Sequence, residues 1–329
     1  MPDAVSMSTP IVSISSIPKR VRHLSEHGAG GVFCIGLAIQ DTLLSVAEIP
    51  RQPVKLYAKA RQEIGGGPAA TASVAISRLG GRAAFAGRLG DDAIGTALRA
   101  ELAAEGVDTQ WLRQFAGHKS PGSVILVDEA GERLIVAYAD PDLPSDAGWL
   151  DPERLGDGVL CDLSWPQGAL KVLGAARKRK IPSVLDADIS RHGHEHAAAL
   201  VEAADHVVFS RPGLAQFAGT DDIAAGLRSA ARPSHKLIGV TDGAAGLYWL
   251  SDGELVNARP PSVTVVDTVG AGDAFHGALA VALARRWPLE RAIAFSNAVA
   301  ALKCTKPGGR AGLPNAEELA RFDPAFALS

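Results

Sequence analysis

The sequence predicts an α/β protein whose main parallel sheet is covered by helices on both faces and carries a second, smaller protruding sheet. Three observations support this fold class. Short apolar runs alternate with helical segments along most of the 329 residues. The stretches 40–64 and 115–140 instead alternate apolar and polar residues, as exposed two-faced strands do. Gly numbers 35 and aromatic residues make up only 5%, which suits closely packed helices and tight turns.

The N-terminal half begins with an apolar run at 31–37 (GVFCIGL), which predicts a buried strand. Residues 69–80 (AATASVAISRLG) place Ala and Val at helical spacing and end in a glycine suited to a helix C-terminus. A strand at 83–90 and a helix at 91–106, which starts with two Asp and ends in Gly, follow. This order predicts the first part of a parallel sheet.

The C-terminal half repeats the strand and helix rhythm more regularly. Buried strands are predicted at GVLCDL, PSVLDAD, HVVFS and KLIGVTDG, with helices between them. LYWLSDGELV predicts a hairpin and TVVDTVG a further strand and turn, and two helices are expected at 271–285 and 288–303. Such alternation predicts parallel strands buried between two helical layers.

Composition excludes several classes of protein. With 33 basic and 36 acidic residues, the net charge of −3 provides no surface for nucleic acid and no polybasic membrane anchor. Three scattered cysteines favour a reducing, cytoplasmic setting over a disulfide framework. No apolar run is long enough to predict a membrane-spanning helix. Residues 1–29 predict a disordered tail, and residues 30–329 a single α/β domain.

The segment 266–277 (VDTVGAGDAFHG) carries the clearest chemical signal. Small residues let backbone N–H groups converge at the positive end of the following helix, where they can bind an anion such as a phosphoryl group. Asp273 is expected in the first helical turn, where its carboxylate could accept a proton from an attacking hydroxyl. The alternative is structural, with Gly270 and Gly272 forming a tight turn and Asp273 capping the helix.

Beyond this local reading, DTVGAGDAFHGALA resembles the C-terminal signature of the ribokinase-like (PfkB) family of ATP-dependent sugar kinases. The segments GGGPAAT and GRLGDDAIG resemble the family's N-terminal signature, and the likeness extends over residues 31 to about 315. The resemblance implies a Rossmann-like, three-layer αβα domain with a small β-sheet lid, formed by strands from about 40–64 and 115–140. It also implies ATP and Mg2+ as cofactors and transfer of the γ-phosphoryl group to a sugar hydroxyl.

The resemblance also assigns roles to individual residues. Asp273 would be the catalytic base, and the amides of Gly270, Ala271 and Gly272 would form the anion hole. The sugar would be bound by Asp41, Gly66 and Gly67, with Thr71 where many members have Asn. The nucleotide would contact Thr241, Asp242, Gly243, Gly246 and Asn297. Asp267 and the carbonyl of Val269 match the position of a monovalent cation, such as K+, beside the anion hole.

One departure concerns the family's Asn-x-x-Glu motif, which organises Mg2+, phosphate and water. The matching segment is 210–213 (SRPG), which lacks both side chains. Mg2+ would then rely on phosphate and water, or Arg211 would supply charge; the simpler interpretation of Arg211 is a solvated surface residue.

Within the family, several segments are most similar to the sulfofructose kinases. Lys55 matches one of the three residues that hold the sulfonate in that branch, whereas Ala137 and Ser164 occupy the other two positions. A sulfonate needs charge-assisted donors, so a neutral ketohexose or ribose-like sugar is expected, with 6-deoxy-6-sulfofructose as the alternative. Lys119 or Arg133 could also supply charge from the lid. Trp165 is either a wall for the sugar or a core aromatic.

Two further functions remain open at this point. A nucleoside kinase is one, although the lid has few aromatic residues to stack a base. A non-catalytic sugar or nucleotide sensor is the other, suggested by the missing Asn-x-x-Glu motif. The exposed edge of a lid sheet is commonly covered by pairing, so the resemblance implies a homodimer through the lid.

Overall fold

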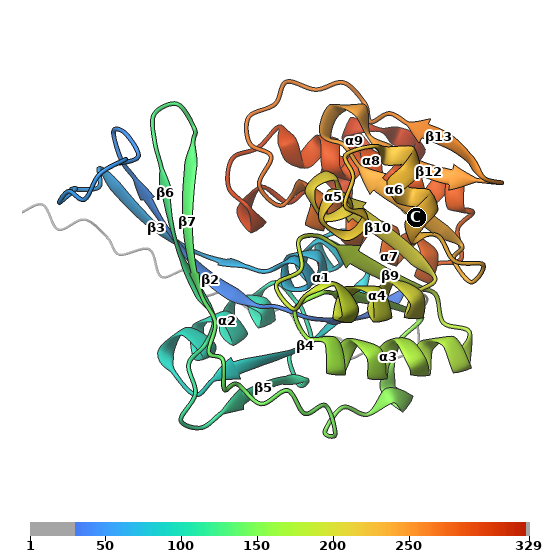
Figure 1. Cartoon of the computed structure of the whole chain (residues 1–329), viewed down its shortest axis with the longest axis horizontal. Helices are drawn as coiled ribbons and strands as arrows, with labels where there is room; N and C mark the ends of the chain where they lie inside the picture. Colours follow the sequence, from blue (N-terminus) through green and yellow to red (C-terminus); the bar gives the residue numbers. More distant parts are fainter. Residues whose placement is uncertain (1–29, 327–329) are drawn as a thin grey trace, which may run out of the picture.

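The computed structural model describes residues 30–326; the predicted tail at 1–29 lies outside them. The described chain builds a 9-stranded main sheet in the order β13-β12-β11-β10-β9-β8-β1-β4-β5 (Figure 1). Its strands are β1 (Gly31–Ile35), β4 (Arg82–Gly90), β5 (Leu112–Phe115), β8 (Gly158–Asp162), β9 (Ser183–Ala187), β10 (His206–Ser210), β11 (Leu237–Thr241), β12 (Leu247–Ser251) and β13 (Glu254–Ala258). β12 and β13 are antiparallel additions, whereas the others pair in parallel.

Helices cover both faces of this sheet, which confirms the predicted layers (Figure 1). One face carries α1 (Pro68–Arg78), α2 (Ala93–Ala104), α7 (Ala271–Ala284) and α8 (Leu289–Cys304), with α9 (Ala316–Phe322) against α8. The other carries α3 (Pro166–Arg179), α4 (His194–Ala203), α5 (Arg211–Ala218) and α6 (Ile223–Ala230). Short 3-10 turns are η1 (Pro152–Arg154), η2 (Gly243–Ala245), η3 (Arg310–Gly312) and η4 (Pro324–Phe326).

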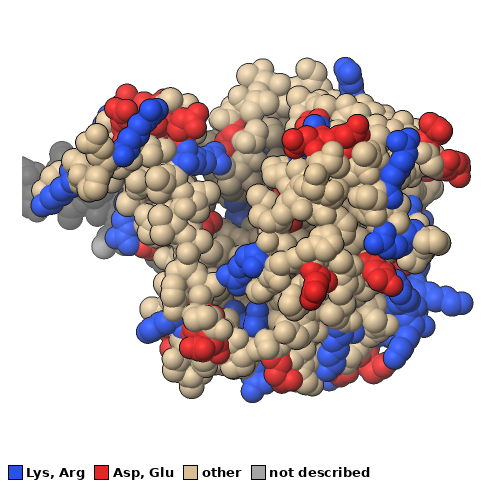
Figure 2. Space-filling model, viewed as in Figure 1, with Lys and Arg blue, Asp and Glu red and all other residues tan. Residues whose placement is uncertain are grey.

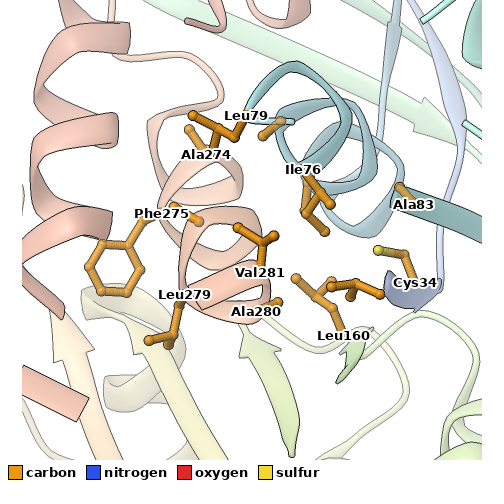
Figure 3. Packing of buried hydrophobic residues seen from close by; sticks show 14 of the residues in the cluster. Cys34, Ile76, Leu79, Ala83, Leu160, Ala274, Phe275, Leu279, Ala280 and Val281 are labelled. Carbon is orange, nitrogen blue, oxygen red and sulfur yellow. The ribbon is translucent and has the colours of Figure 1, made fainter. Parts of the chain in front are cut away.

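The central strand shows why two cores form. On β1, Val32 and Cys34 belong to one hydrophobic cluster and Phe33 and Ile35 to the other, because successive strand side chains point to opposite faces. Figure 3 shows Cys34 and Leu160 from the sheet near side chains of α1 and α7. Glycine at position 277 lets these two helices pack closely. A Cβ there would lie 2.6 Å from the Ala72 carbonyl oxygen.

The lid is a separate 4-stranded sheet in the order β3-β2-β6-β7. It consists of β2 (Ile39–Ser45), β3 (Ala60–Gly66), β6 (Gly122–Val127) and β7 (Arg133–Tyr138), and stands to the left of the body in Figure 1. The predicted second sheet is therefore confirmed, although Phe115 belongs to β5 of the main sheet rather than to the lid. Figure 2 shows a hollow between lid and body, and charges of both signs dispersed over this face.

One predicted strand is wrong. The TVVD stretch contains β-branched residues, but residues 259–266 form no strand, and the side chains of Val265 and Val266 are 58% and 59% exposed. β13 is paired with β12, and the extended segment instead donates hydrogen bonds from Val266 N and Asp267 N to the Cys304 carbonyl at the end of α8.

The parallel strands end in line, and this alignment positions the site. Asp162 at the end of β8 is in register with Asp186 of β9, and Ser210 at the end of β10 is in register with Thr241 of β11. Open α/β sheets bind ligands at this carboxyl edge. The lid lies over the same edge, because Ile39 and Ala137 of the lid share a cavity with Asp186.

Candidate active site

Glycines between β3 and α1 bring the backbone close to a lid carboxylate. Gly67 has a φ of 97°, and a Cβ there would lie 2.2 Å from the Leu37 carbonyl oxygen. A Cβ on Gly66 would lie 2.3 Å from Oδ2 of Asp41. Asp41 accepts a hydrogen bond from the Ser123 hydroxyl on β6. Burial raises the pKa of Asp41, although this hydrogen bond and the charge of Arg310 oppose the shift.

A cavity of about 230 Å³ lies between lid and body. Its body side is lined by three carboxylates, Asp162, Asp186 and Asp188, and by Arg191. Ala137 and Ser164 also line it, so the positions compared with sulfonate-binding residues do face this space. We call it the sugar-side cavity. A second cavity, of about 380 Å³, shares Ser164 and Arg191 with it and is also lined by Arg88.

The first turn of α7 presents free amides. Gly270 adopts the left-handed conformation at the helix N-cap, with a φ of 77°. Among residues 30–326, the N–H groups of Gly270, Gly272 and Asp273 have no hydrogen-bond acceptor, as an anion-binding helix start requires. The Ala271 amide differs, because it donates to the Thr268 carbonyl at 3.1 Å. This turn corrects the predicted anion hole: Ala271 N–H is engaged, and Asp273 N–H is free.

Asp273 lies next to other charged groups. Burial raises the pKa of its carboxyl group well above the ordinary value, and the negative charges of Asp186 and Asp188 raise it further. His276 and Arg310 oppose that shift. The His276 ring connects α7 to the sheet, with Nδ1 2.8 Å from the Gly272 carbonyl and 3.2 Å from Asp186 Oδ2, and Nε2 3.2 Å from the Val208 carbonyl. A carboxylate with a raised pKa is a stronger base, which favours proton abstraction.

Arg310, which sequence reasoning missed, connects the sugar side to the start of α7. The residue is 4% exposed. Nη2 donates to the Gly66 carbonyl at 2.6 Å, Nε to the Thr71 hydroxyl at 3.2 Å, and Nη1 to Glu101 Oε1 at 3.1 Å. Thr71 is therefore engaged by an arginine rather than open to a ligand.

A cavity of about 520 Å³ lies on the other side of the α7 start, and we call it the nucleotide cavity. It is lined by four predicted nucleotide residues and two from the α7 turn, namely Thr241, Gly243, Gly246, Asn297, Ala271 and Gly272. Its size is that of a small-molecule or cofactor site. Asp242 is not among the lining residues, because its carboxylate pairs with Arg211 Nη1 at 3.2 Å. Arg211 is thus tied to the neighbouring loop.

Protein groups engage Asp267, one of the two residues predicted to hold a monovalent cation. Asp267 Oδ1 accepts from Val269 N at 2.9 Å, and Oδ2 accepts from Gly308 N at 2.8 Å. The Asp267 carbonyl accepts from Lys303 Nζ at 3.0 Å. Burial raises the pKa of Asp267, but the two backbone hydrogen bonds and the charges of Lys303 and Arg133 outweigh it and lower that pKa. Burial also lowers the pKa of Lys303, opposed by Asp267.

Residues 30–316 match the family described as pfkB family carbohydrate kinase. The chain belongs to this family. A fructokinase of Vibrio alginolyticus is 31% identical over 281 residues, covering 78% of this chain and 91% of the relative. A ribokinase of Bacillus subtilis (strain 168) is 28% identical over 293 residues, covering 88% and 97%.

Solved structures agree with the fold. A crystal structure from Agrobacterium tumefaciens superposes with a TM-score of 0.83 at 37% identity, covering 91% of this chain and 98% of its own. The Arabidopsis thaliana ribokinase complexed with ribose and ATP gives 0.79 at 23% identity, covering 92% and 100%. This carbohydrate kinase is an ATP-dependent phosphotransferase that acts on a sugar hydroxyl. Among residues 30–326, no helix is long and apolar enough to cross a membrane.

Two residues predicted to contact the sugar, Trp165 and Lys55, do not line the sugar-side cavity. Trp165 is 1% exposed, with Trp149 stacked on it at 5.5 Å and the Arg88 guanidinium 4.9 Å from its ring. It is a core aromatic, because both faces are covered. Lys55 lies on the exposed loop between β2 and β3, above the Tyr57 ring at 5.1 Å, and lines neither the sugar-side nor the nucleotide cavity.

Proposed function

We propose that this kinase phosphorylates a hydroxyl group of a neutral ketohexose, with Asp273 as the general base. The position of Asp273 carries the proposal. It follows Gly272, which lines the nucleotide cavity, and its charge interacts with Asp186, which lines the sugar-side cavity. A base at this junction can take the proton of a sugar hydroxyl that faces the γ-phosphoryl group.

The surrounding groups suit the same reaction. Asp41 and the backbone of Gly66 and Gly67 do not line the sugar-side cavity themselves, but they are close in sequence to Ile39 and Pro68, which do, and they would hold the sugar hydroxyls. The free amides at the α7 start, from Gly270, Gly272 and Asp273, would stabilise the charge that develops on the transferring phosphoryl group. The lid would exclude water, which limits hydrolysis of ATP.

Mg2+ is expected to arrive with the nucleotide. The described residues hold no group of three or more His, Cys, Asp or Glu side chains able to bind a metal. Ser210, at the start of the segment that replaces Asn-x-x-Glu, caps α5 by accepting from Gly213 N at 3.0 Å. Phosphate oxygens and water would therefore supply most ligands of Mg2+, whose charge offsets that of the phosphates.

The lining of the sugar-side cavity favours a neutral substrate. Ala137 and Ser164 carry no charge, and Asp162 and Asp188 would repel an anionic substituent while accepting hydrogen bonds from hydroxyl groups. Arg191 is the single basic residue among those lining this cavity. The fructokinase name of several relatives is consistent with a ketohexose.

An assay of ADP release with a panel of acceptors tests the substrate. Fructose and other ketohexoses are expected to give the highest kcat/KM, at least about tenfold above ribose, 6-deoxy-6-sulfofructose and nucleosides. Preference for the sulfonated sugar would indicate that Arg191 binds an anionic substituent. Preference for a nucleoside would indicate that the sugar-side cavity holds a nucleobase. Either result overturns the ketohexose proposal.

We also propose that a second copy of the chain covers the lid. Ile135, Val136 and Tyr138 on the edge strand β7 are 59%, 63% and 52% exposed. An exposed apolar edge strand is commonly covered by a partner. Light scattering after size exclusion is expected to give a dimer, and Val136→Lys to give a monomer. A wild-type monomer at micromolar concentration would contradict dimerisation.

A further inference from the structure

We propose that the ammonium group of Lys303 is a built-in cation that replaces a bound monovalent cation, so that this kinase needs no K+. Lys303 Nζ donates to the Asp267 carbonyl at 3.0 Å and to the Lys306 carbonyl at 3.4 Å. It also lies 3.7 Å from Asp267 Oδ2. Two carbonyl oxygens and a carboxylate are the donors that would surround K+, and here they surround a nitrogen of the same charge.

The environment of Lys303 is unusual for a lysine. Its side chain is 0% exposed, whereas lysine is almost never fully buried unless its charge is paired. It stands in the last turn of α8 and reaches from that helix into the loop that precedes α7. Two carbonyl oxygens accept hydrogen bonds from the ammonium group, and a carboxylate oxygen lies within ion-pair distance. The chain therefore buries a charge and supplies its partners.

Lys303 influences the active site through the carboxylate of Asp267. Its carboxylate fixes the turn before the anion hole, through Val269 N on one oxygen and Gly308 N on the other. An isolated carboxylate in this position would be costly, and the Lys303 charge balances it. Lys303 is thus a positioning residue, which holds the backbone that leads to Gly270 without touching the substrate.

The other charged neighbour of Asp267 offers a matched control. Arg133, at the start of β7 in the lid, places Nη2 3.6 Å from Asp267 Oδ1 and is 43% exposed. Solvent screens this pair because the Arg133 side chain is partly exposed. Water would take the place of the lost side chain, so the variant opens no buried space for an ion. Arg133→Met therefore removes a charge near the same carboxylate without emptying the Lys303 position.

The inference rests on the kinase reaction for its activity readout, so the wild-type enzyme is first tested with its best acceptor, whichever sugar that is. At constant ionic strength, kcat in K+, Na+ and tetramethylammonium salts is expected to agree within about twofold. Activation of the wild type by K+ of tenfold or more overturns the inference, and this measurement needs no variant.

The variant Lys303→Ala is expected to create a cation requirement. Its kcat should fall at least tenfold in tetramethylammonium and recover partly with K+ or NH4+, and Arg133→Met should show no such response. Binding is measured separately by thermal unfolding without sugar or ATP, in which K+ should raise the Tm of Lys303→Ala but not of the wild type. If Lys303→Ala fails to fold, Lys303→Met, which keeps most of the apolar stem, replaces it. A folded variant whose Tm and kcat ignore K+ contradicts the proposal, and this outcome is independent of which sugar is phosphorylated.

Discussion

The guanidinium of Arg310 donates a 2.6 Å hydrogen bond to the carbonyl oxygen of Gly66. Through this contact, a residue of the C-terminal segment fixes the glycine loop beside the lid. The same side chain pairs with Glu101 on α2. One buried arginine therefore joins three segments that are distant in the sequence, and several consequences can be measured.

Replacing Arg310 should affect sugar binding more than the chemical step. Arg310→Gln leaves Glu101 without its ion pair and is expected to lower the free energy of unfolding by about 2–4 kcal/mol. Its KM for the sugar should rise at least tenfold. Arg310→Lys restores charge but not the forked geometry, so it should recover stability more than KM. Urea unfolding and steady-state kinetics check both. An unchanged KM in a folded Arg310→Gln would show that Gly66 needs no such support.

The raised pKa of Asp273 predicts that activity declines on the acidic side of the pH profile, in a limb controlled by this carboxyl group. Because the base must be deprotonated, kcat/KM should fall as the pH drops through a pKa above the ordinary 3.8. Asp186→Asn removes a negative neighbour and should move this limb to lower pH. Asp188→Asn removes the other negative neighbour and should move it in the same direction. An unmoved limb in both variants would contradict the electrostatic account. Asp273→Asn should lose about 10²–10⁴-fold in kcat while still binding sugar.

The same carboxyl group should cost stability at neutral pH. Since its pKa is higher in the folded than in the unfolded state, the unfolded state releases the proton first as the pH rises. Stability is therefore lost between the ordinary and the raised pKa. Asp273→Asn removes this loss and should raise the free energy of unfolding by about 1 kcal/mol at pH 8, with no gain near pH 3. Chemical denaturation at the two pH values tests the sign. A destabilised Asp273→Asn at pH 8 would refute it.

Glycine at position 67 is required by geometry. Its φ of 97° and the 2.2 Å approach of a Cβ to the Leu37 carbonyl predict that Gly67→Ala is strongly destabilised and does not bind sugar. Gly174 in α3 is the matched control, since a Cβ there meets nothing within 4 Å. Gly174→Ala should gain about 0.5–1 kcal/mol from helix propensity. The Tm of each variant is compared with that of the wild type. A Tm of Gly67→Ala as high as that of Gly174→Ala would contradict the requirement for glycine at position 67.

Local patterns predicted most of the fold because each element shows its own periodicity. The helices expected at 271–285 and 288–303 are observed as Ala271–Ala284 and Leu289–Cys304. The strand expected around Val265 is absent because the segment donates its backbone hydrogen bonds to the Cys304 carbonyl at the end of α8, and β-branched residues alone do not decide pairing.

The site could be predicted only in part. The GAGD turn is contiguous, so the sequence itself brings Asp273 to the free amides. Asp186, Arg310 and Lys303 are single residues on separate segments, and only the topology of the sheet brings them near this turn. A signal existed for Lys303, which is a charged residue within an otherwise apolar helix end, but spacing gave it no partner. The hydrogen bond that removes the Ala271 amide depends on the exact turn, which no residue pattern specifies.

Three of the residues that face the sugar-side cavity stand just beyond the ends of the main-sheet strands. Ser164 follows β8, and Asp188 and Arg191 follow β9, whereas the two cores are built by side chains inside the strands. Exchanges at these three positions need no repacking of the interior. Over evolutionary time, the preferred acceptor can therefore drift by single substitutions at nearly constant stability, while the phosphoryl-transfer apparatus on α7 is inherited unchanged.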